Sequence, residues 1–283
     1  MENMENKEFQ QIFGEFSEFK RKSSIMAEVA YLSAYWDKQG VAVATCNNQF
    51  GVFEDGEIYG NFCRQRICPQ CQRRLSLKTY ALLLKVVKVT NGRWLMMTLT
   101  VRNVKAHRLD KTISRLFLKF SEMWREELKV RFNGCFRALE VTYNAERDDY
   151  HPHFHCLINV TDDYFTSNKY LKQSALVDVW RGYWGGDNDG GADLRVIDDN
   201  EKGVAEVAKY AVKPFDFNDE ETAVKMLDEL FTTLRARRLT QTYGTVKTAL
   251  NAVKNEYKEL EKKNPQDAEK WYFWNGENYF TRG

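Results

Sequence analysis

The sequence predicts an α+β protein in which helices pack on a central antiparallel sheet. Segments of strand length and segments of helical spacing are mixed along the chain, without the strict βαβ rhythm of a parallel sheet. No glycine-rich phosphate-binding loop follows a predicted strand. The 283 residues, of which 43% are hydrophobic and 14% aromatic, are enough to bury a sizeable core.

The N-terminal part of the chain divides into a helical segment and a cysteine-rich region. Apolar residues recur at helical spacing over residues 1–40, and the pattern ends near Gly40, which predicts an N-terminal helical segment. Residues 41–88 are predicted to form a zinc-binding region followed by a basic helix. In this region, turn formers favour small hairpins up to residue 75, and the helix covers about 73–88.

The remainder divides into a central domain over residues 89–240 and a helical, aromatic C-terminal segment over residues 241–283. Apolar and β-favouring content predicts the strands, and amphipathic spacing predicts the helices. The predicted strands cover residues 94–101, 135–143, 153–160 and 193–197. The predicted helices cover residues 109–129, 170–184, 201–213, 223–238 and 245–263.

Three of the four histidines lie in the run His151-Pro152-His153-Phe154-His155-Cys156. Because the run opens a predicted strand, alternate side chains share a face, and the three imidazoles project together. Histidines that are only satisfied by hydrogen bonds are the alternative. The spacing of two residues favours a metal site.

Four cysteines have the spacing of a second metal site. Cys63-x4-Cys68-Pro69-x-Cys71 follows Cys46, with sixteen residues between the first two cysteines. Paired knuckles of this kind can place thiolates tetrahedrally around Zn²⁺, and disulfides are disfavoured in a reducing compartment. The pattern predicts a structural zinc site with Cys46 as the fourth ligand.

A catalytic zinc site of the deaminase type is excluded by the motif order, because no glutamate follows a histidine in an H-x-E pattern before the cysteine pair. The two remaining cysteines, Cys135 and Cys156, are predicted to be small buried residues within strands.

The charge distribution predicts contact with nucleic acid. The net charge is only +2, but from Ile58 to Leu109 there is no acidic residue, against eleven Lys and Arg. Basic residues interleaved with aromatic ones suit a phosphate backbone, although charges balanced elsewhere in the fold are the alternative. The predicted DNA contacts are Arg64, Arg66, Arg73, Arg74, Lys78 and Arg102.

The predicted helix over residues 201–213 could carry a nucleophile. Glu206, Tyr210 and Lys213 fall on one stripe, and Pro214 ends the helix. A phenol attacks only when a base takes its proton or a cation stabilises the phenolate, and the glutamate and the lysine can supply these. The alternative is an exposed, salt-bridged helix face. Together with a metal site and a basic surface, the stripe provides the components for covalent cleavage of a phosphodiester.

Four motifs stand in a fixed order along the chain. They are Cys63-x-x-Arg66-x-Cys68-Pro69-x-Cys71-x-x-Arg74, L-M-M-T-L-T-V-R-N at 95–103, H-P-H-F-H-C-L at 151–157 and E-x-x-x-Y-x-x-K at 206–213. With these four motifs in this order, the sequence resembles the HUH endonucleases. Among these it resembles the rolling-circle replication initiators of Gram-positive plasmids.

The resemblance implies a palm-like sheet that presents the histidines beneath the tyrosine helix. It implies that His153 and His155 bind Mg²⁺ or Mn²⁺, with Glu140 as third ligand and His151 as its competitor. Tyr210 would nick and rejoin DNA, leaving a 5′-phosphotyrosine and a 3′-hydroxyl primer. Glu206 would activate water or a hydroxyl at termination.

The implied partners are DNA, as an origin hairpin or a single strand, and a host helicase and polymerase; the sequence is also compatible with an oligomer. A transposase or relaxase of the same superfamily and a non-catalytic, zinc-stabilised DNA-binding regulator are the alternatives. No apolar run approaches the roughly 18 residues of a membrane span, and no secretory signal is evident, so a cytoplasmic protein is expected.

Overall fold

The computed structural model describes residues 2–33, 36–54, 58–66, 68–185, 189–208, 220–259 and 264–281. The chain forms two compact units. Unit 1 comprises residues 1–75, 214–235 and 261–283, and unit 2 comprises residues 76–213 and 236–260. The two ends of the chain therefore belong to the same unit.

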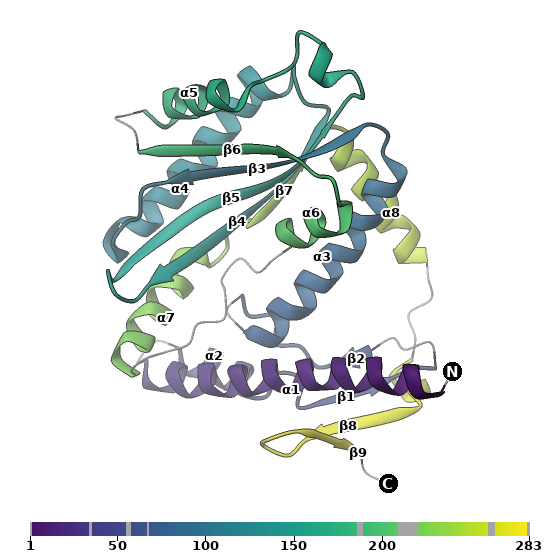
Figure 1. The fold of residues 1–283 in the computed structure, drawn as a ribbon. Helices are drawn as coiled ribbons and strands as arrows, with labels where there is room; N and C mark the ends of the chain where they lie inside the picture. The colour runs from purple at the N-terminus through teal and green to yellow at the C-terminus, as the bar shows by residue number, and fades with distance from the viewer. Residues whose placement is uncertain are drawn as a thin grey trace. The chain divides into compact units, whose positions relative to one another are not determined.

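Unit 2 is built on a five-stranded sheet with the order β6-β3-β5-β4-β7, in which every pair is antiparallel (Figure 1). The strands are β3 (Arg93–Val101), β4 (Gly134–Asn144), β5 (Asp149–Val160), β6 (Gly190–Val196) and β7 (Thr240–Tyr243). This confirms the predicted antiparallel sheet with packed helices. Strand β5, which carries the histidines, is central and begins four residues before its predicted start.

One face of this sheet is covered by α3 (Pro69–Val89), α6 (Asn200–Val207) and α8 (Gly244–Glu259) (Figure 1). Their apolar side chains meet alternate residues of β3, β4 and β5, because successive side chains of a strand point to opposite faces of the sheet. The buried members of this cluster include Leu83, Val86, Met96, Phe136, Leu157, Val204, Val207, Val246 and Leu250.

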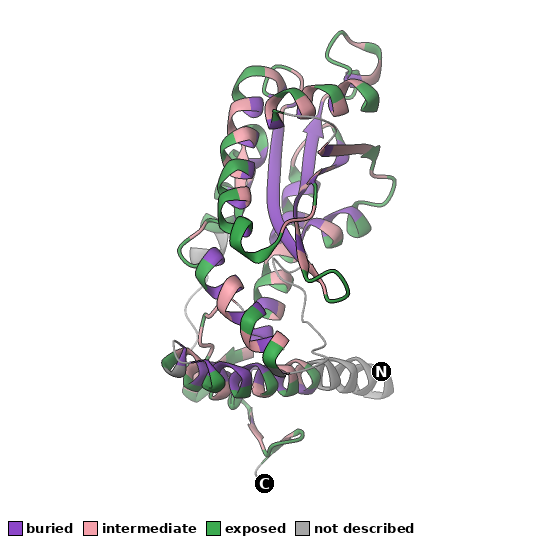
Figure 2. Ribbon diagram, turned by 90° about the vertical axis from the view of Figure 1, so that its left-hand side faces the viewer, coloured by how far each residue is buried: buried purple, intermediate pink, exposed green. Residues whose placement is uncertain are grey.

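The opposite face packs against α4 (Ala106–Met123), which continues as one π-helical turn over Trp124–Leu128, and against α5 (Gln173–Trp184). Arg137 is buried on this face, with its guanidinium 4.4 Å from the ring centroid of Phe117 and 4.5 Å from that of Phe154. Burial lowers the pKa of Arg137. The aromatic faces supply favourable electrostatic contacts for this cation. Figure 2 shows that the long strands are buried along most of their length.

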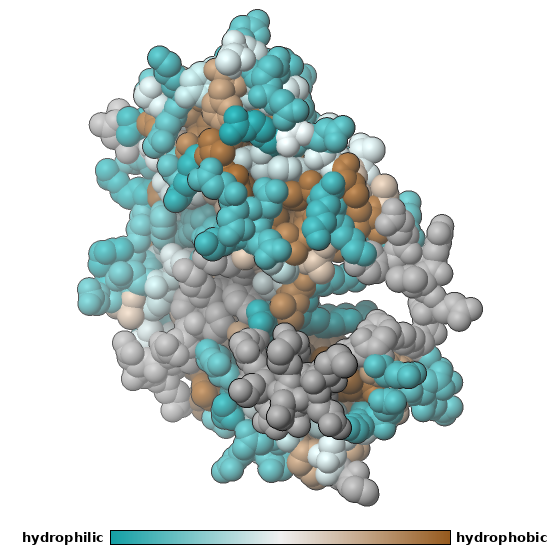
Figure 3. All heavy atoms as spheres, turned by 45° about the vertical axis from the view of Figure 1, so that its right-hand side comes forward, coloured by the Kyte–Doolittle hydropathy of each residue, from teal (hydrophilic) through white to brown (hydrophobic). Residues whose placement is uncertain are grey.

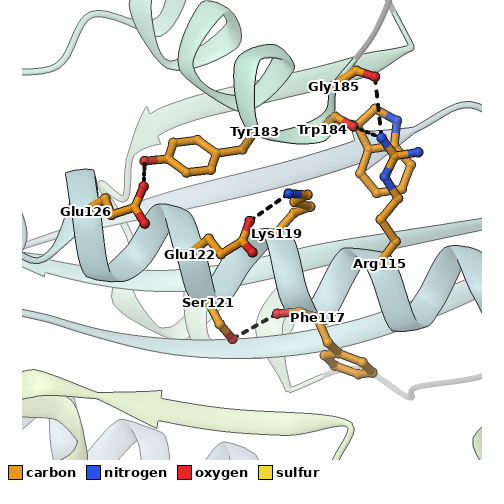
Figure 4. A network of polar contacts seen from close by, with 9 residues as sticks. All are labelled: Arg115, Phe117, Lys119, Ser121, Glu122, Glu126, Tyr183, Trp184 and Gly185. Atoms are coloured by element: carbon orange, nitrogen blue, oxygen red, sulfur yellow. Dashed lines mark hydrogen bonds and ion pairs between the residues drawn. The ribbon is translucent and has the colours of Figure 1, made fainter.

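Polar contacts join α4 to α5 on the outer side of this layer (Figure 4). The Tyr183 hydroxyl donates to Glu126 at 2.7 Å. The Arg115 guanidinium lies 4.6 Å from the ring of Trp184 and also donates to the backbone carbonyl of that residue. Gly185 ends α5 in the left-handed region, with φ of 77°, a conformation that favours glycine.

Unit 1 contains a four-stranded antiparallel sheet with the order β2-β1-β8-β9. The strands are β1 (Gln49–Val52), β2 (Ile58–Gly60), β8 (Lys270–Trp274) and β9 (Tyr279–Thr281). The aromatic run at 271–274 thus pairs with residues more than two hundred positions earlier. Phe50 stacks on Tyr272 at 5.1 Å and on Phe16 at 5.6 Å, which joins the sheet to the N-terminal helix.

The N-terminal prediction was wrong in one respect. The segment is helical, as α1 (Glu2–Leu32) and α2 (Asp37–Ala44), but the helical structure does not end near Gly40, which lies inside α2. A Cβ atom at Gly40 would come within 3.3 Å of the Ala30 Cβ. The glycine therefore permits the close approach of two helices and does not end one.

Other predicted helices differ at their ends. Helix α7 (Glu220–Leu234) starts before and stops short of the predicted 223–238. Of the helix predicted over 201–213, residues up to 207 form α6, while Lys209 to Asp219 lie outside the described residues. In unit 1, α7 packs on α1 and α2, where Trp36 stacks on Phe231 with ring centroids 4.5 Å apart.

Within the described ranges, no helix combines the length and the apolar character that crossing a bilayer requires. On the face drawn in Figure 3, hydrophilic side chains predominate, and hydrophobic ones form smaller groups between them.

Candidate functional site

The strand register of unit 2 brings a carboxylate to the histidines. Glu140 on β4 pairs directly with His153 on β5, and Thr98 on β3 pairs with His155. Because side chains alternate, all of these residues lie on one face of the sheet, together with His151. It is the face that carries α3, α6 and α8 further along the strands.

Glu140, His153 and His155 converge as a group of three possible metal ligands. The two Nε2 atoms are 3.1 Å apart, and the Glu140 Oε2 lies 3.1 Å from that of His155 and 3.6 Å from that of His153. An octahedral ion with bonds of about 2.1 Å has neighbouring ligand atoms about 3.0 Å apart. The spacing of the three atoms therefore fits one octahedral face.

Contacts of the Nδ1 atoms, on the side of each ring opposite the converging Nε2 atoms, orient both imidazoles. The Nδ1 of His153 lies 3.1 Å from the backbone oxygen of His151, which can only accept, so Nδ1 donates and Nε2 keeps its lone pair. The Nδ1 of His155 lies 3.3 Å from the hydroxyl of Thr98, which can accept in the same way. Such contacts fix the tautomer that a metal ligand requires.

The carboxyl group of Glu140 is held as an anion. Only 4% of this residue is exposed. Burial alone would raise the pKa of Glu140, but the close contacts of its carboxyl group with the imidazoles of His153 and His155 outweigh burial, so the pKa lies well below the usual range. A carboxylate and two imidazole lone pairs around one point favour a bound cation.

His151 is a neighbour of this group and not one of its three members. Its ring stacks on that of His153 with centroids 4.9 Å apart, and its carbonyl orients the same ring. Burial, followed by the charge of His153, lowers the pKa of His151 and favours the neutral ring. Of the two third ligands that the sequence leaves open, the structure groups Glu140 with the pair.

Helix α6 carries Glu206 on the histidine-bearing face of the sheet. Val204 and Val207 pack in the same cluster as Leu157, which lies two residues beyond His155 on that face. At the end of the helix, the Ser76 hydroxyl of α3 donates to the Ala208 carbonyl at 2.7 Å.

The Asp199 side chain caps the start of α6 by accepting from two backbone N–H groups. Glu206 itself is half-buried. The other two predicted members of its stripe, Tyr210 and Lys213, lie outside the described residues.

The four predicted zinc ligands converge in unit 1. The Sγ of Cys71 lies 3.6 Å from that of Cys46 and 3.6 Å from that of Cys63, and Cys68 completes the group. The backbone N–H of Arg64 donates to the Cys71 sulfur at 3.1 Å. Hydrogen bonds from Cys46 and Cys63 lower the pKa of the Cys71 thiol. Cys135 and Cys156, predicted to be buried in strands, are buried in β4 and β5.

The structure also shows a residue that the sequence analysis missed. Lys20 of α1 is fully buried near this cluster, and burial lowers the pKa of its ammonium, while the charges of Cys46 and Cys68 oppose the shift. This burial was hard to predict from the sequence, because Lys20 opens the basic run Lys20-Arg21-Lys22, and lysines on a helix normally face water.

The predicted DNA contacts occupy different environments. Arg64 and Lys78 are exposed, whereas Arg66 is half-buried, which lowers its pKa. Arg74 lies over the ring of Phe62 at 4.4 Å, and Arg73 lies over that of Phe19 at 5.7 Å. Arg102 forms an ion pair with Asp189 at 2.9 Å.

A profile of the replication-protein family matches residues 58–279, a range that contains both metal-ligand groups except Cys46. The chain belongs to this family. The relatives of this chain include a "Protein rep" of Bacillus amyloliquefaciens, 31% identical over 270 residues that cover 81% of this chain and 78% of the relative. A "Protein rep" of a Bacillus species is 33% identical over 249 residues, covering 75% and 80% of the two chains.

A further "Protein rep" from Streptococcus pneumoniae is 33% identical over 199 residues, covering 64% of this chain and 62% of the relative. No solved structure matches the replication protein significantly. These similarities confirm the predicted relationship to the replication initiators of Gram-positive bacteria and assign the replication protein a role in DNA replication.

Proposed function

We propose that the protein initiates rolling-circle replication of a plasmid by nicking one strand of origin DNA. Tyr210 is the nucleophile, and it forms a 5′-phosphotyrosine link while a 3′-hydroxyl is released as primer. The observation that supports this most strongly is that Glu140, His153 and His155 converge on the sheet face against which α6 packs. That helix leads directly to Tyr210.

The short separation along the chain supports the placement of the nucleophile. Tyr210 follows Ala208 by two residues, and two extended residues span at most about 7 Å. Ala208 is hydrogen-bonded to Ser76 of α3, which holds the end of α6 on the histidine-bearing face of the sheet. The distance that Tyr210 can reach is counted from this fixed point.

Glu140, His153 and His155 would hold the divalent cation, Mg²⁺ or Mn²⁺. Two imidazoles and one carboxylate suit Mn²⁺, and oxygen ligands from substrate and water would suit either ion. When bound, such a cation withdraws charge from the non-bridging oxygens of the scissile phosphate. Thr98 and the His151 carbonyl keep the ligand nitrogens turned toward it.

In the cleavage step, the phenol oxygen of Tyr210 bonds to phosphorus as the bond to the 3′ oxygen breaks. The phenol proton is taken up by a base, and the departing 3′ oxygen receives a proton. Lys213, three residues further along the motif, would stabilise the phenolate. The new phosphotyrosine retains a phosphodiester, so the same site can rejoin strands.

The DNA is an origin hairpin or single strand, and Arg64, Arg66, Arg73, Arg74, Lys78 and Arg102 would contact its phosphates and bases. Charge neutralisation of phosphates and stacking on bases depend little on the DNA sequence. These residues therefore account for the affinity for DNA more than for the choice of origin. A host helicase and a polymerase would unwind the strand and extend the 3′ end.

The decisive assay incubates supercoiled origin DNA with the protein and Mn²⁺. We expect open circles that carry protein on the 5′ end, and none when EDTA replaces the metal. Supercoils that stay intact although the protein binds the DNA would show a regulator without catalysis.

Thr98→Val tests the orientation of the metal ligands. Valine keeps the shape of the side chain but removes the hydroxyl that holds His155, so Mn²⁺ affinity should fall by about 10-fold or more. The control is Thr100→Val on the same strand, where the hydroxyl contacts the Gly191 carbonyl. Titration of Mn²⁺ by calorimetry compares the two, and equal affinities would argue against the orienting role.

Glu206→Ala separates initiation from termination. With one tyrosine in the motif, we propose that Glu206 activates water or a hydroxyl to release the enzyme at the end of a round. Release should slow by about 10²–10⁴-fold, the range for a general base, while the first nick persists. Normal release of this variant in a replication-termination assay would remove Glu206 from the mechanism.

A further inference from the structure

The cysteine cluster of unit 1 is bordered by one stripe of helix α1. Lys20 is 0% exposed, and its Nζ donates to the carbonyls of Ala44 and Cys46, each at 2.7 Å. One turn further, the Ser23 hydroxyl lies 3.7 Å from the Cys68 sulfur. These side chains are three positions apart, so they point to the same side of the helix.

The contacts made by the buried ammonium of Lys20 are with neutral groups. In the part of the chain that the structure describes, no Asp or Glu forms an ion pair with it, and its contacts are two neutral carbonyls. A buried charge is strongly unfavourable unless an opposite charge lies nearby. The groups in this cluster that can become anionic are the sulfurs of the four cysteines, which give up their protons when they bind a metal.

We propose that Cys46, Cys63, Cys68 and Cys71 bind one zinc ion, and that Lys20 supplies the counter-charge that stabilises this tetrathiolate and fastens α1 to it. Zinc with four thiolates carries a net charge of −2, which one ammonium offsets by half. Tetrahedral Zn–S bonds of about 2.3 Å place sulfurs about 3.8 Å apart. The observed separations of 3.6 Å agree with this value.

Backbone donors complete the outer shell. The N–H of Cys63 lies 3.4 Å from the Cys46 sulfur, and the N–H of Arg64 lies 3.1 Å from that of Cys71. Arg64 has a φ of 60°, in the left-handed region, which turns this part of the loop around the sulfur. Hydrogen bonds of this type offset thiolate charge around structural zinc.

Two disulfides are the rival use of four cysteines. All four are free thiols in the structure, with sulfur separations far longer than the roughly 2.05 Å of a disulfide bond. Disulfides would also remove the negative charge and leave the Lys20 ammonium buried without a counter-ion. Both the geometry and the charge therefore favour a metal.

Helix α1 is attached to this cluster at further points. The Gln70 side chain, next to Cys71, donates to the Phe16 carbonyl at 2.8 Å, and the Gln70 N–H donates to the Ser23 hydroxyl at 3.3 Å. Removal of the metal should therefore loosen the middle of α1 as well as the cysteine loop.

The first test measures metal in the intact protein. We expect one zinc per chain by elemental analysis, and the intense ligand-field and sulfur-to-metal charge-transfer bands of a tetrathiolate site when Co²⁺ replaces zinc. Absence of zinc, together with cobalt bands that lack the charge-transfer component, would overturn the proposal. This test is independent of nicking, because it requires no DNA.

The second test addresses Lys20. Lys20→Met should weaken zinc binding by about 10–100-fold in competition with a chelator, the range for outer-shell partners. The matched control is Lys22→Met, which alters a lysine paired with Glu18 on the same helix and should change zinc affinity less than twofold. Equal zinc affinity of the two variants would refute the counter-charge role.

A measurement on the unmodified protein covers the case in which Lys20→Met does not fold. Hydrogen exchange of the amides around residues 16–24 should accelerate at least tenfold when a chelator removes zinc. Unchanged exchange in this segment after full removal of the metal would refute the link between α1 and the zinc site.

Discussion

The Tyr210→Phe variant is expected to lose nicking of supercoiled origin DNA by a factor of about a thousand or more. Phenylalanine keeps the aromatic ring but lacks the oxygen that bonds to phosphorus, and loss of a covalent nucleophile removes most of the catalysed rate. Origin binding should persist, because the basic residues are unchanged. A gel assay for open circles and a mobility assay for binding measure the two properties on one preparation.

Tyr170→Phe is the matched control for this substitution. Tyr170 is 42% exposed and lies in the segment before α5, so loss of its hydroxyl should leave nicking within about twofold. A Tyr210→Phe protein that still forms open circles with attached protein would contradict the assignment of the nucleophile.

Glu140→Gln is expected to have the second largest effect. Glutamine has nearly the same size but no charge, so the site keeps its shape and loses the anion that faces both imidazoles. We expect Mn²⁺ affinity to fall by about a hundredfold or more, and nicking at low Mn²⁺ to fall with it. Calorimetric titration of the metal and nicking across a range of Mn²⁺ concentrations test this.

His151→Gln distinguishes the two third ligands that the sequence leaves open. His151 stacks on His153 but is not a member of the converging group, so its loss should reduce Mn²⁺ affinity by less than about tenfold. If His151→Gln weakens the metal more than Glu140→Gln does, the geometric assignment is wrong.

In unit 2, the spacing of apolar and polar residues within single segments was enough to predict several of the strands and helices. The strand that bears the histidines follows from its apolar run and from spacing by two, and the structure places it in the centre of an antiparallel sheet. The residue opposite His153 could not be derived in this way, because register depends on the neighbouring strand. Glu140 came from a resemblance, and the pairing of β4 with β5 supplies its physical basis.

Long-range packing explains what the sequence did not predict in unit 1. The segment Trp271–Trp274 is a strand because it pairs with β1, and no local pattern records a partner so distant in sequence. Gly40 suggested a helix end, but it lies inside α2, where a Cβ atom would come within 3.3 Å of the Ala30 Cβ. In the sequence, Lys20 has the character of an exposed helical lysine. In the structure it is fully buried, because the cysteine loop packs on it.

The partners of the individual basic residues could not be predicted, for the same reason. Arg102 was assigned to DNA because its sequence neighbours carry no acid, yet it pairs with Asp189, far along the chain. Charge composition identifies a kind of partner, whereas the partner of each individual side chain depends on the fold.

Mass spectrometry of the peptide that remains bound to nicked origin DNA tests the central claim most directly. The account predicts one adduct, a phosphodiester between the 5′ end of the DNA and the oxygen of Tyr210, formed only with Mn²⁺ or Mg²⁺. A nick without any attached peptide, or an adduct on a different residue, would contradict it.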